Sequence, residues 1–291
     1  MSKFKEALEK GKFVVTTEIG PPKGVSLDGV FKELECVKGR VHAVNVTDQQ
    51  SSIMRLGSIA TSKFLLDEGY EPICQITCRD RNRIMLQSDI LSAYALGIRN
   101  MLVMTGDHPL LGDHPSAKPV YDLDSVGLLH AFGELQTGRD LAGNKLETVP
   151  NLYVGAVVNP GSDSLELEIL KMEKKVAEGA RFFQTQAIFV GALFEKFIKS
   201  IKHLKKDIKI LGGIVPLKSV KMARYMNTNI PGVVIPEEII QRLENARDVE
   251  TESVAIASDI FSAIRPMCDG IHFMPIRANH LVAKILDKNG M

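Results

Sequence analysis

The stretch PICQITCRDRNRIMLQSDILSAYALGIRNMLVMTGD, residues 72–107, holds two short apolar runs joined by a segment with helical spacing. The runs 72–78 and 100–106 are almost continuously apolar, as is typical of parallel strands that are covered on both faces. Between them, apolar residues from Ile84 to Ala95 recur on one side of a helix. The stretch therefore predicts a strand, a helix and a second strand parallel to the first.

This alternation of apolar runs and helical segments continues along the whole chain. We expect strands at residues 13–18, 43–48, 72–78, 100–106, 152–158, 182–188, 209–215 and 270–276. Eight strands that alternate with helices predict an α/β protein whose residues 1–291 form a single (β/α)8 (TIM) barrel domain. An extra turn and helix at 229–247 should precede the last strand, and the Pro- and Gly-rich loop 107–123 should carry function.

Composition excludes several classes of protein. The 291 residues are 45% hydrophobic and 24% charged, and the net charge of +1 gives no electrostatic reason to expect nucleic acid or an anionic membrane as a partner.

The charged N-terminal segment lacks the apolar core of a signal peptide. The cysteines form no CxxC pair, so we expect reduced thiols and no metal site. These features predict a cytoplasmic protein.

In a barrel of this kind, the carboxyl ends of all the strands open onto one face, where the active site lies. The expected ends collect Glu18, Thr47, Thr77, Gly106, Asp107, Asn159, Gln186, Pro216 and Arg277. A carboxyl group such as Glu18, flanked by apolar residues at the barrel mouth, is able to donate a proton near neutral pH. A solvated loop glutamate explains this segment equally well.

The other strand ends permit binding chemistry. Gly106 would let backbone amides approach a flat or phosphorylated ligand, although a Gly-Asp turn is common. Gln186 offers both the donor and the acceptor that a lactam edge requires, or it is a satisfied polar residue inside the barrel. Arg277 suits a carboxylate or phosphate, with a surface salt bridge as the alternative. His108 and His114 are expected to be solvent-exposed loop residues.

The order of these short motifs is more specific than any one of them. Glu18 is followed by VNVT (44–47), ITC (76–78), TGD (105–107), NP (159–160), EGA and TQ (178–186), GIVP (213–216), and HF and RA (272–278). From about residue 12 to the C-terminus, the chain thereby resembles the methylenetetrahydrofolate reductase family. The resemblance implies a flavin-containing barrel of one-carbon metabolism that reduces 5,10-methylenetetrahydrofolate to 5-methyltetrahydrofolate.

The resemblance also implies roles for individual residues. Glu18 would be the general acid that assists opening of the folate's five-membered ring, and the charge of Asp107 would stabilise a cationic iminium intermediate. Gln186 would bind the pterin and Arg277 the folate tail. Positions that contact the flavin, FAD or FMN, would be Thr47 (which also contacts substrate), Gln75, Thr105, Gly106, Asp107, Asn159, Glu168 and Lys175.

The chain departs from well-known family members at several of these positions. Thr105 stands where they carry arginine, Gln75 and Asn159 where they carry histidines, and Glu168 where they carry aspartate. These differences leave FMN as an alternative to FAD. Val220 stands where NADH-using members have an aromatic residue that stacks on the nicotinamide nucleotide, which suggests a different electron source.

Three hypotheses follow. The first is a flavin-dependent methylenetetrahydrofolate reductase that forms an oligomer. The second is a flavin- or folate-binding subunit of a larger electron-transfer complex, in which a partner protein supplies electrons and the isolated chain is inactive with NAD(P)H. The third is a flavin-free barrel that binds pterin for methyl transfer.

Overall fold

The computed structural model describes residues 2–230 and 232–291, which form a closed barrel of eight parallel strands in sequential order. The strands are β1 (Val14–Ile19), β2 (Ala43–Val46), β3 (Pro72–Thr77), β4 (Asn100–Met104), β5 (Tyr153–Val158), β6 (Phe182–Ala187), β7 (Lys209–Ile214) and β8 (Gly270–Phe273). β1 closes the barrel because Thr16 pairs with Ala43 of β2 on one side and with His272 of β8 on the other.

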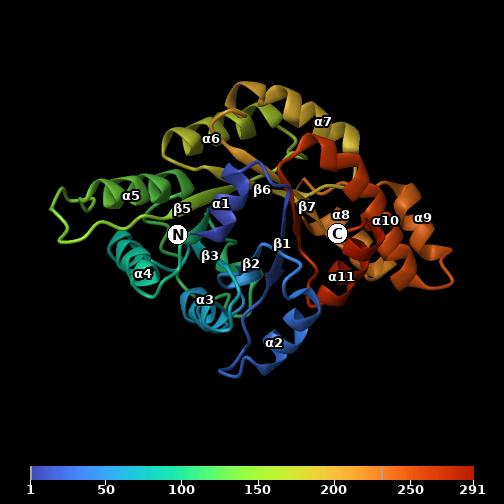
Figure 1. The fold of residues 1–291 in the computed structure, drawn as a ribbon, viewed down its shortest axis with the longest axis horizontal. Coiled ribbons are helices and arrows are strands. Elements are labelled where there is room, and N and C mark those ends of the chain that lie inside the picture. The colour runs from blue at the N-terminus through green and yellow to red at the C-terminus, as the bar shows by residue number, and fades with distance from the viewer. Residues whose placement is uncertain (1, 231) are drawn as a thin grey trace.

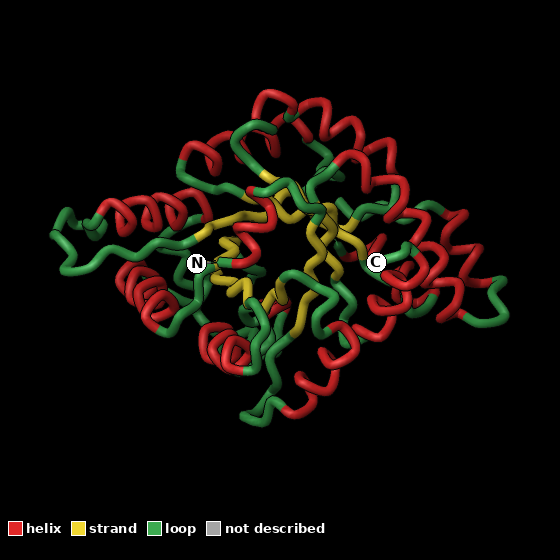
Figure 2. The backbone as a smooth tube through the Cα atoms, viewed as in Figure 1, coloured by secondary structure: helices red, strands yellow, loops and turns green. Residues whose placement is uncertain are grey.

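Helices surround the strands, as Figures 1 and 2 show. They are α1 (Lys3–Glu9), α2 (Asp28–Leu34), α3 (Ser58–Asp67), α4 (Arg83–Ala95), α5 (Ser125–Thr137), α6 (Leu165–Ala177), α7 (Gly191–Ser200), α8 (Val220–Asn229), α9 (Glu237–Glu244), α10 (Val249–Ile264) and α11 (Asn279–Lys288). Among the described residues, no helix is long and apolar enough to cross a membrane.

The (β/α)8 barrel and all eight strands are confirmed, and so is the helical insertion before the last strand, where α9 lies. Position 231 of that insertion lies outside the described residues. The ends of the strands are less well predicted. The eighth strand is predicted to continue to Ile276, but the ladder ends at Phe273. A strand cannot extend to Ile276 because Ile276 and Arg277 adopt left-handed backbone angles (φ 48° and 62°).

Helical spacing predicted the buried face of α4 with two errors. Leu86 and Ile90 are fully buried, whereas Ile84 is 71% exposed and Ala95, at the other end of the helix, is exposed too. Ile84 lies in the first turn, next to the N-cap Asn82, where the helix begins to pack against the barrel. Spacing predicts which side of a helix is apolar but not how far the barrel wall covers it.

Helix α1 closes one end of the barrel. Its Phe4 is fully buried against Phe182 of β6 and Tyr153 of β5, with ring centroids 5.2 and 6.0 Å apart. Burial of an aromatic ring of this kind stabilises a fold by about 2 to 3 kcal/mol. The amino ends of the strands are therefore filled with apolar side chains, and the opposite end is left for a site.

Candidate active site

A cavity of about 460 Å³ opens at the carboxyl ends of the strands. It is lined by ten of the residues expected from the sequence, namely Glu18, Gln75, Thr77, Thr105, Gly106, Asp107, Asn159, Glu168, Lys175 and Gln186. Neither Thr47 nor Arg277 is among the lining residues. A volume of this size is in the range of small-molecule and cofactor sites.

Glu18 is held by side chains from three other β–α units. Its Oε2 accepts a hydrogen bond from Gln75 Nε2 at 3.1 Å, and its Oε1 accepts one from Gln50 Nε2 at 3.3 Å. The Nε2 atom of His272 lies 3.7 Å from Oε2, and the other ring nitrogen of His272 lies 3.0 Å from the hydroxyl of Thr16. The carboxyl group thus faces the cavity with a fixed orientation and an imidazole beside it.

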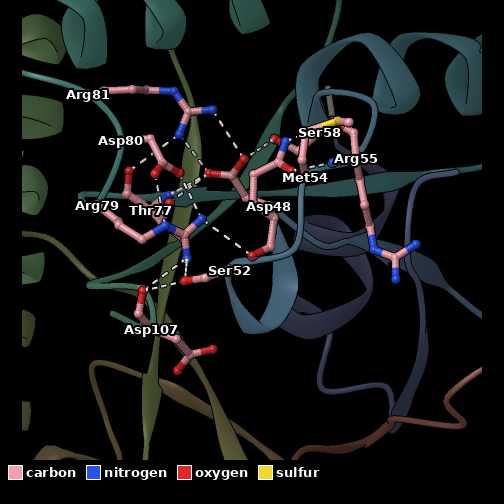
Figure 3. A network of polar contacts seen from close by, with 12 residues as sticks. Asp48, Ser52, Met54, Arg55, Ser58, Thr77, Arg79, Asp80, Arg81 and Asp107 are labelled. Carbon is pink, nitrogen blue, oxygen red and sulfur yellow. Dashed lines mark hydrogen bonds and ion pairs between the residues drawn. The ribbon is translucent and has the colours of Figure 1, made fainter. Parts of the chain in front are cut away.

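Asp107 presents a free carboxylate to the same cavity. Within residues 2–230 and 232–291, its side chain makes no hydrogen bond or ion pair, and Figure 3 shows it pointing away from the neighbouring polar network. The preceding Gly106 has a φ of 91°, and a Cβ there would lie 3.0 Å from the Cβ of Thr77. Glycine is therefore required for the turn that places Asp107 at the rim.

A buried cation lies on the α6 side of the cavity. Lys175 is 7% exposed, and its ammonium donates a hydrogen bond to the carbonyl of Val157 at 2.8 Å. Burial lowers the pKa of Lys175, and the nearby charge of Glu168 partly opposes this effect. Glu168 also accepts a hydrogen bond from the backbone N–H of Asn159 at 2.9 Å. This group combines positive charge with fixed donors and acceptors.

The two glutamines of β6 have different surroundings. Gln184 and Asn45 are buried and exchange two amide hydrogen bonds, at 2.6 and 3.0 Å, on the floor of the cavity. The Oε1 atom of Gln186 accepts from the backbone N–H of Ala187 at 3.1 Å. Its amide N–H groups have no partner in the described part of the chain, so they are available to a ligand.

The order of motifs and this geometry agree with a comparison against known families. Residues 3–290 match the family model described as methylenetetrahydrofolate reductase. The chain belongs to the methylenetetrahydrofolate reductase family.

Two curated relatives share about a quarter of their residues with the chain over the matched region. Methylenetetrahydrofolate reductase 2 of Schizosaccharomyces pombe is 26% identical over 80% of the chain, which spans 38% of that protein. The 5,10-methylenetetrahydrofolate reductase of Salmonella typhimurium is 26% identical over 65% of the chain, which spans 59% of it.

A solved structure shares the fold. It is a Clostridium thermocellum protein described as binding two copies of 5-methyl-5,6,7,8-tetrahydrofolic acid, with a TM-score of 0.66, 18% identity, and coverage of 99% of this chain and 100% of that one. At this identity the match establishes the fold alone.

Two residues assigned through the family resemblance lie outside the cavity. Thr47 is 1% exposed, and its hydroxyl has no hydrogen-bond partner among residues 2–230 and 232–291. Arg277 is exposed on the loop after β8. Contact of either residue with a ligand stays a prediction.

Of the cavity residues that were not singled out from the sequence, three bear directly on Glu18 and Asp107: His272, Gln50 and Arg79. His272 belongs to the HF motif of the family pattern, so its position beside Glu18 could have been suspected. Gln50 and Arg79 lie on loops after β2 and β3, and no local pattern marks them. Their importance depends on contacts between separate β–α units.

A network of ion pairs and hydrogen bonds joins the carboxyl ends of β2 and β3 in this family member (Figure 3). Asp48 accepts hydrogen bonds from the backbone N–H and hydroxyl of Thr77, at 2.8 and 3.0 Å, and from Arg81 at 2.7 Å. Arg81 also pairs with Asp89 at 2.7 Å. Because the charges are both paired and hydrogen-bonded, they hold β2 against β3 without leaving a charge uncompensated.

Proposed function

We propose that this chain catalyses the flavin-dependent reduction of 5,10-methylenetetrahydrofolate to 5-methyltetrahydrofolate. The observation that carries the proposal is the convergence of Glu18, Asp107 and the free amide of Gln186 on one cavity. The names of the Salmonella typhimurium and Schizosaccharomyces pombe relatives support the same reaction. A cytoplasmic location and an oligomeric assembly, expected from the sequence, belong to the same proposal.

The chemistry of the cavity fits a flavin, FAD or FMN. The ammonium of Lys175 suits an anionic phosphate, and Ser125, in the first turn of α5, brings a further hydroxyl to the wall. Leu102, Met104 and Val157 offer apolar surface to a flat ring. When bound, the flavin supplies the hydride that the reduction requires.

In this proposal Glu18 is the general acid. Its carboxyl group would donate a proton to the leaving nitrogen of the folate's five-membered ring, which makes opening of the ring easier. The hydrogen bonds from Gln75 and Gln50 fix its direction, and the imidazole of His272, 3.7 Å away, would return the proton.

Asp107 would stabilise positive charge on the opened folate. Because no cation neutralises its carboxylate in the described structure, its full negative charge is available to an iminium ion nearby. Gln186 would bind the pterin edge through its free N–H groups. Arg277 would bind the carboxylates of the folate tail from its exposed loop, and Thr47 would approach the ligands from its place directly after β2.

A protein electron donor is a second candidate source of electrons. Val220 lies in the first turn of α8, is half-buried and does not line the cavity, so it offers no stacking face to a nicotinamide. Leu110 and Leu111, on the loop after β4, are 68% and 73% exposed. An apolar rim of this kind favours a partner that docks beside the cavity.

The test begins with an absorption spectrum of the purified protein, before and after incubation with FAD or FMN. We expect flavin bands, their bleaching by a reduced viologen dye, and reoxidation when 5,10-methylenetetrahydrofolate is added, with formation of 5-methyltetrahydrofolate. Protein that stays colourless after flavin is added would contradict the proposal. Flavin that binds and is reduced, but that the folate never reoxidises, would favour a purely flavin-binding subunit.

A further inference from the structure

The loop after β2 connects the two carboxylates of the cavity. Gln50, on this loop, donates to Glu18, while Ser52, two residues later, donates its hydroxyl hydrogen to the carbonyl of Asp107 at 2.7 Å. A single turn of the chain therefore contacts the side chain of one carboxylate residue and the backbone of the other. The turn therefore links the two carboxylate residues, which the barrel supplies from β1 and from the loop after β4.

The turn is held in an unfavourable conformation. Gln49, Ser51 and Ser52 all have left-handed backbone angles, with φ of 50°, 55° and 56°. A non-glycine residue in this region costs of the order of 1 kcal/mol or more, so surrounding contacts must maintain it. The facing loop after β4 approaches so closely that a Cβ at Gly112 would lie 1.9 Å from the carbonyl oxygen of Ser52.

Arg79 supplies those contacts. Its Nη2 donates to the carbonyl of Gln49 at 3.3 Å, and its Nη1 donates to the Ser52 hydroxyl at 2.9 Å and to the Asp107 carbonyl at 3.2 Å. The side chain is 3% exposed, and a two-point pair with Asp80 fixes the orientation of the guanidinium. Figure 3 shows the guanidinium between the turn and Asp107.

We propose that Arg79 is a positioning residue that holds the 49–52 turn against Asp107 and thereby sets the geometry of Glu18 and Asp107 for the folate step. This role rests on the proposed function. Only a planar group with several fixed donors can reach both carbonyls and Asp80 together, so lysine would keep the charge but lose the geometry. Misplacement of a reacting group by about 1 Å is enough to cost roughly 10²-fold in rate.

The test compares Arg79→Lys with Arg83→Lys. Arg83 is a matched control because it is an arginine at the end of the same loop, where α4 begins. It pairs with the exposed Asp122 and does not line the cavity. Hydrogen–deuterium exchange of the protein, without added folate, should rise about tenfold at residues 50–53 and 107–112 in Arg79→Lys alone. Unchanged exchange there would overturn the proposal without reference to any activity.

Activity then tests the positioning role. In Arg79→Lys, kcat for folate reduction should fall roughly 10- to 100-fold, with the KM for folate and the rate of flavin reduction by a viologen dye near wild type. A wild-type rate would overturn the role even if exchange had risen. Should Arg79→Lys fold poorly, Ser52→Ala should show the same pattern more weakly. Wild-type protein that fails to reduce folate would instead overturn the proposed function itself.

Discussion

Gln75 of β3 donates a hydrogen bond to Glu18 of β1, with 3.1 Å between Nε2 and Oε2, across the intervening strand β2. An amide at this position cannot change its charge near neutral pH, so it orients Glu18 without competing for its proton. His272, on the other side, places its Nε2 atom 3.7 Å from the same carboxylate oxygen. This arrangement makes Glu18 the residue whose replacement is most informative.

We expect Glu18→Gln to abolish folate reduction while the flavin stays bound and reducible by a viologen dye. Glutamine keeps the size and hydrogen-bonding capacity of the side chain but has no proton to donate, and loss of a general acid costs ~10²–10⁴-fold in rate. Stopped-flow spectra of the two half-reactions provide the measurement. Unchanged folate turnover would remove Glu18 from the mechanism.

Asp107→Asn should slow the folate half-reaction by ~10²-fold and flavin reduction much less. The carboxylate is proposed to stabilise a cation that exists only on the folate side, and a charge placed at such a point contributes mainly to that step. The backbone contacts of Asp107 with Arg79 and Ser52 do not depend on the substituted side chain. Equal slowing of both half-reactions would indicate that Asp107 positions the flavin instead.

Lys175 should make flavin binding depend on pH. Burial lowers its pKa below the ordinary value of about 10.4, so the ammonium loses its proton, and its attraction for phosphate, at a lower pH than a free lysine would. The affinity for FMN, measured by fluorescence quenching, should therefore fall as pH rises through this lowered pKa. Lys175→Arg, which stays charged, should bind with a flatter pH profile. Lys175→Met should bind about tenfold or more weakly below the lowered pKa of Lys175, and the difference from wild type should shrink above it.

The same shift affects stability in the absence of flavin. Between the lowered folded-state pKa of Lys175 and its higher unfolded-state pKa, the unfolded chain binds more protons. The contribution of this residue to the free energy of unfolding therefore increases with pH across that window. Urea titrations at several alkaline pH values give the free energy of unfolding of wild type and of Lys175→Met. Plotted against pH, this free energy should rise more steeply for wild type. Parallel plots would contradict the burial effect.

Thr47→Val should stabilise the ligand-free protein by about 1 kcal/mol, because the buried hydroxyl has no hydrogen-bond partner in the described structure. Valine has nearly the same shape, so no cavity forms. If Thr47 also contacts a ligand, as the family resemblance implies, flavin or folate affinity should fall in the same variant. Thermal unfolding and ligand titration measure the two effects separately. A less stable variant would show that the hydroxyl has a partner.

The identity of the electron donor can be tested directly. If Val220 leaves the nicotinamide unstacked, NADH and NADPH should reduce the isolated chain poorly, since a stacking contact worth ~1 kcal/mol or more is missing. The viologen dye, which needs no such contact, serves as the control. Rapid and stoichiometric bleaching of the flavin band on anaerobic mixing with NADH would defeat this idea.

Sequence alone determined the architecture of this protein and much of its site. Apolar runs and helical spacing are local properties, so the eight strands could be counted directly, and closure of parallel strands requires their carboxyl ends to meet. Glu18, Asp107 and Gln186 could therefore be assigned to one cavity before any contact was known. Residues such as Ile84 show the limit, because the extent of burial depends on neighbouring elements.

Only the tertiary structure decided which side chains act on those carboxylates. Gln50, Gln75 and His272 reach Glu18 from three separate β–α units, and Arg79 reaches Asp107 from the loop after β3. Such contacts depend on strand register, on loop conformations with left-handed residues, and on rotamers, none of which leaves a periodic trace in the sequence. Hydrogen bonds require their atoms to lie within a few tenths of an ångström, a precision that arises only when the barrel closes.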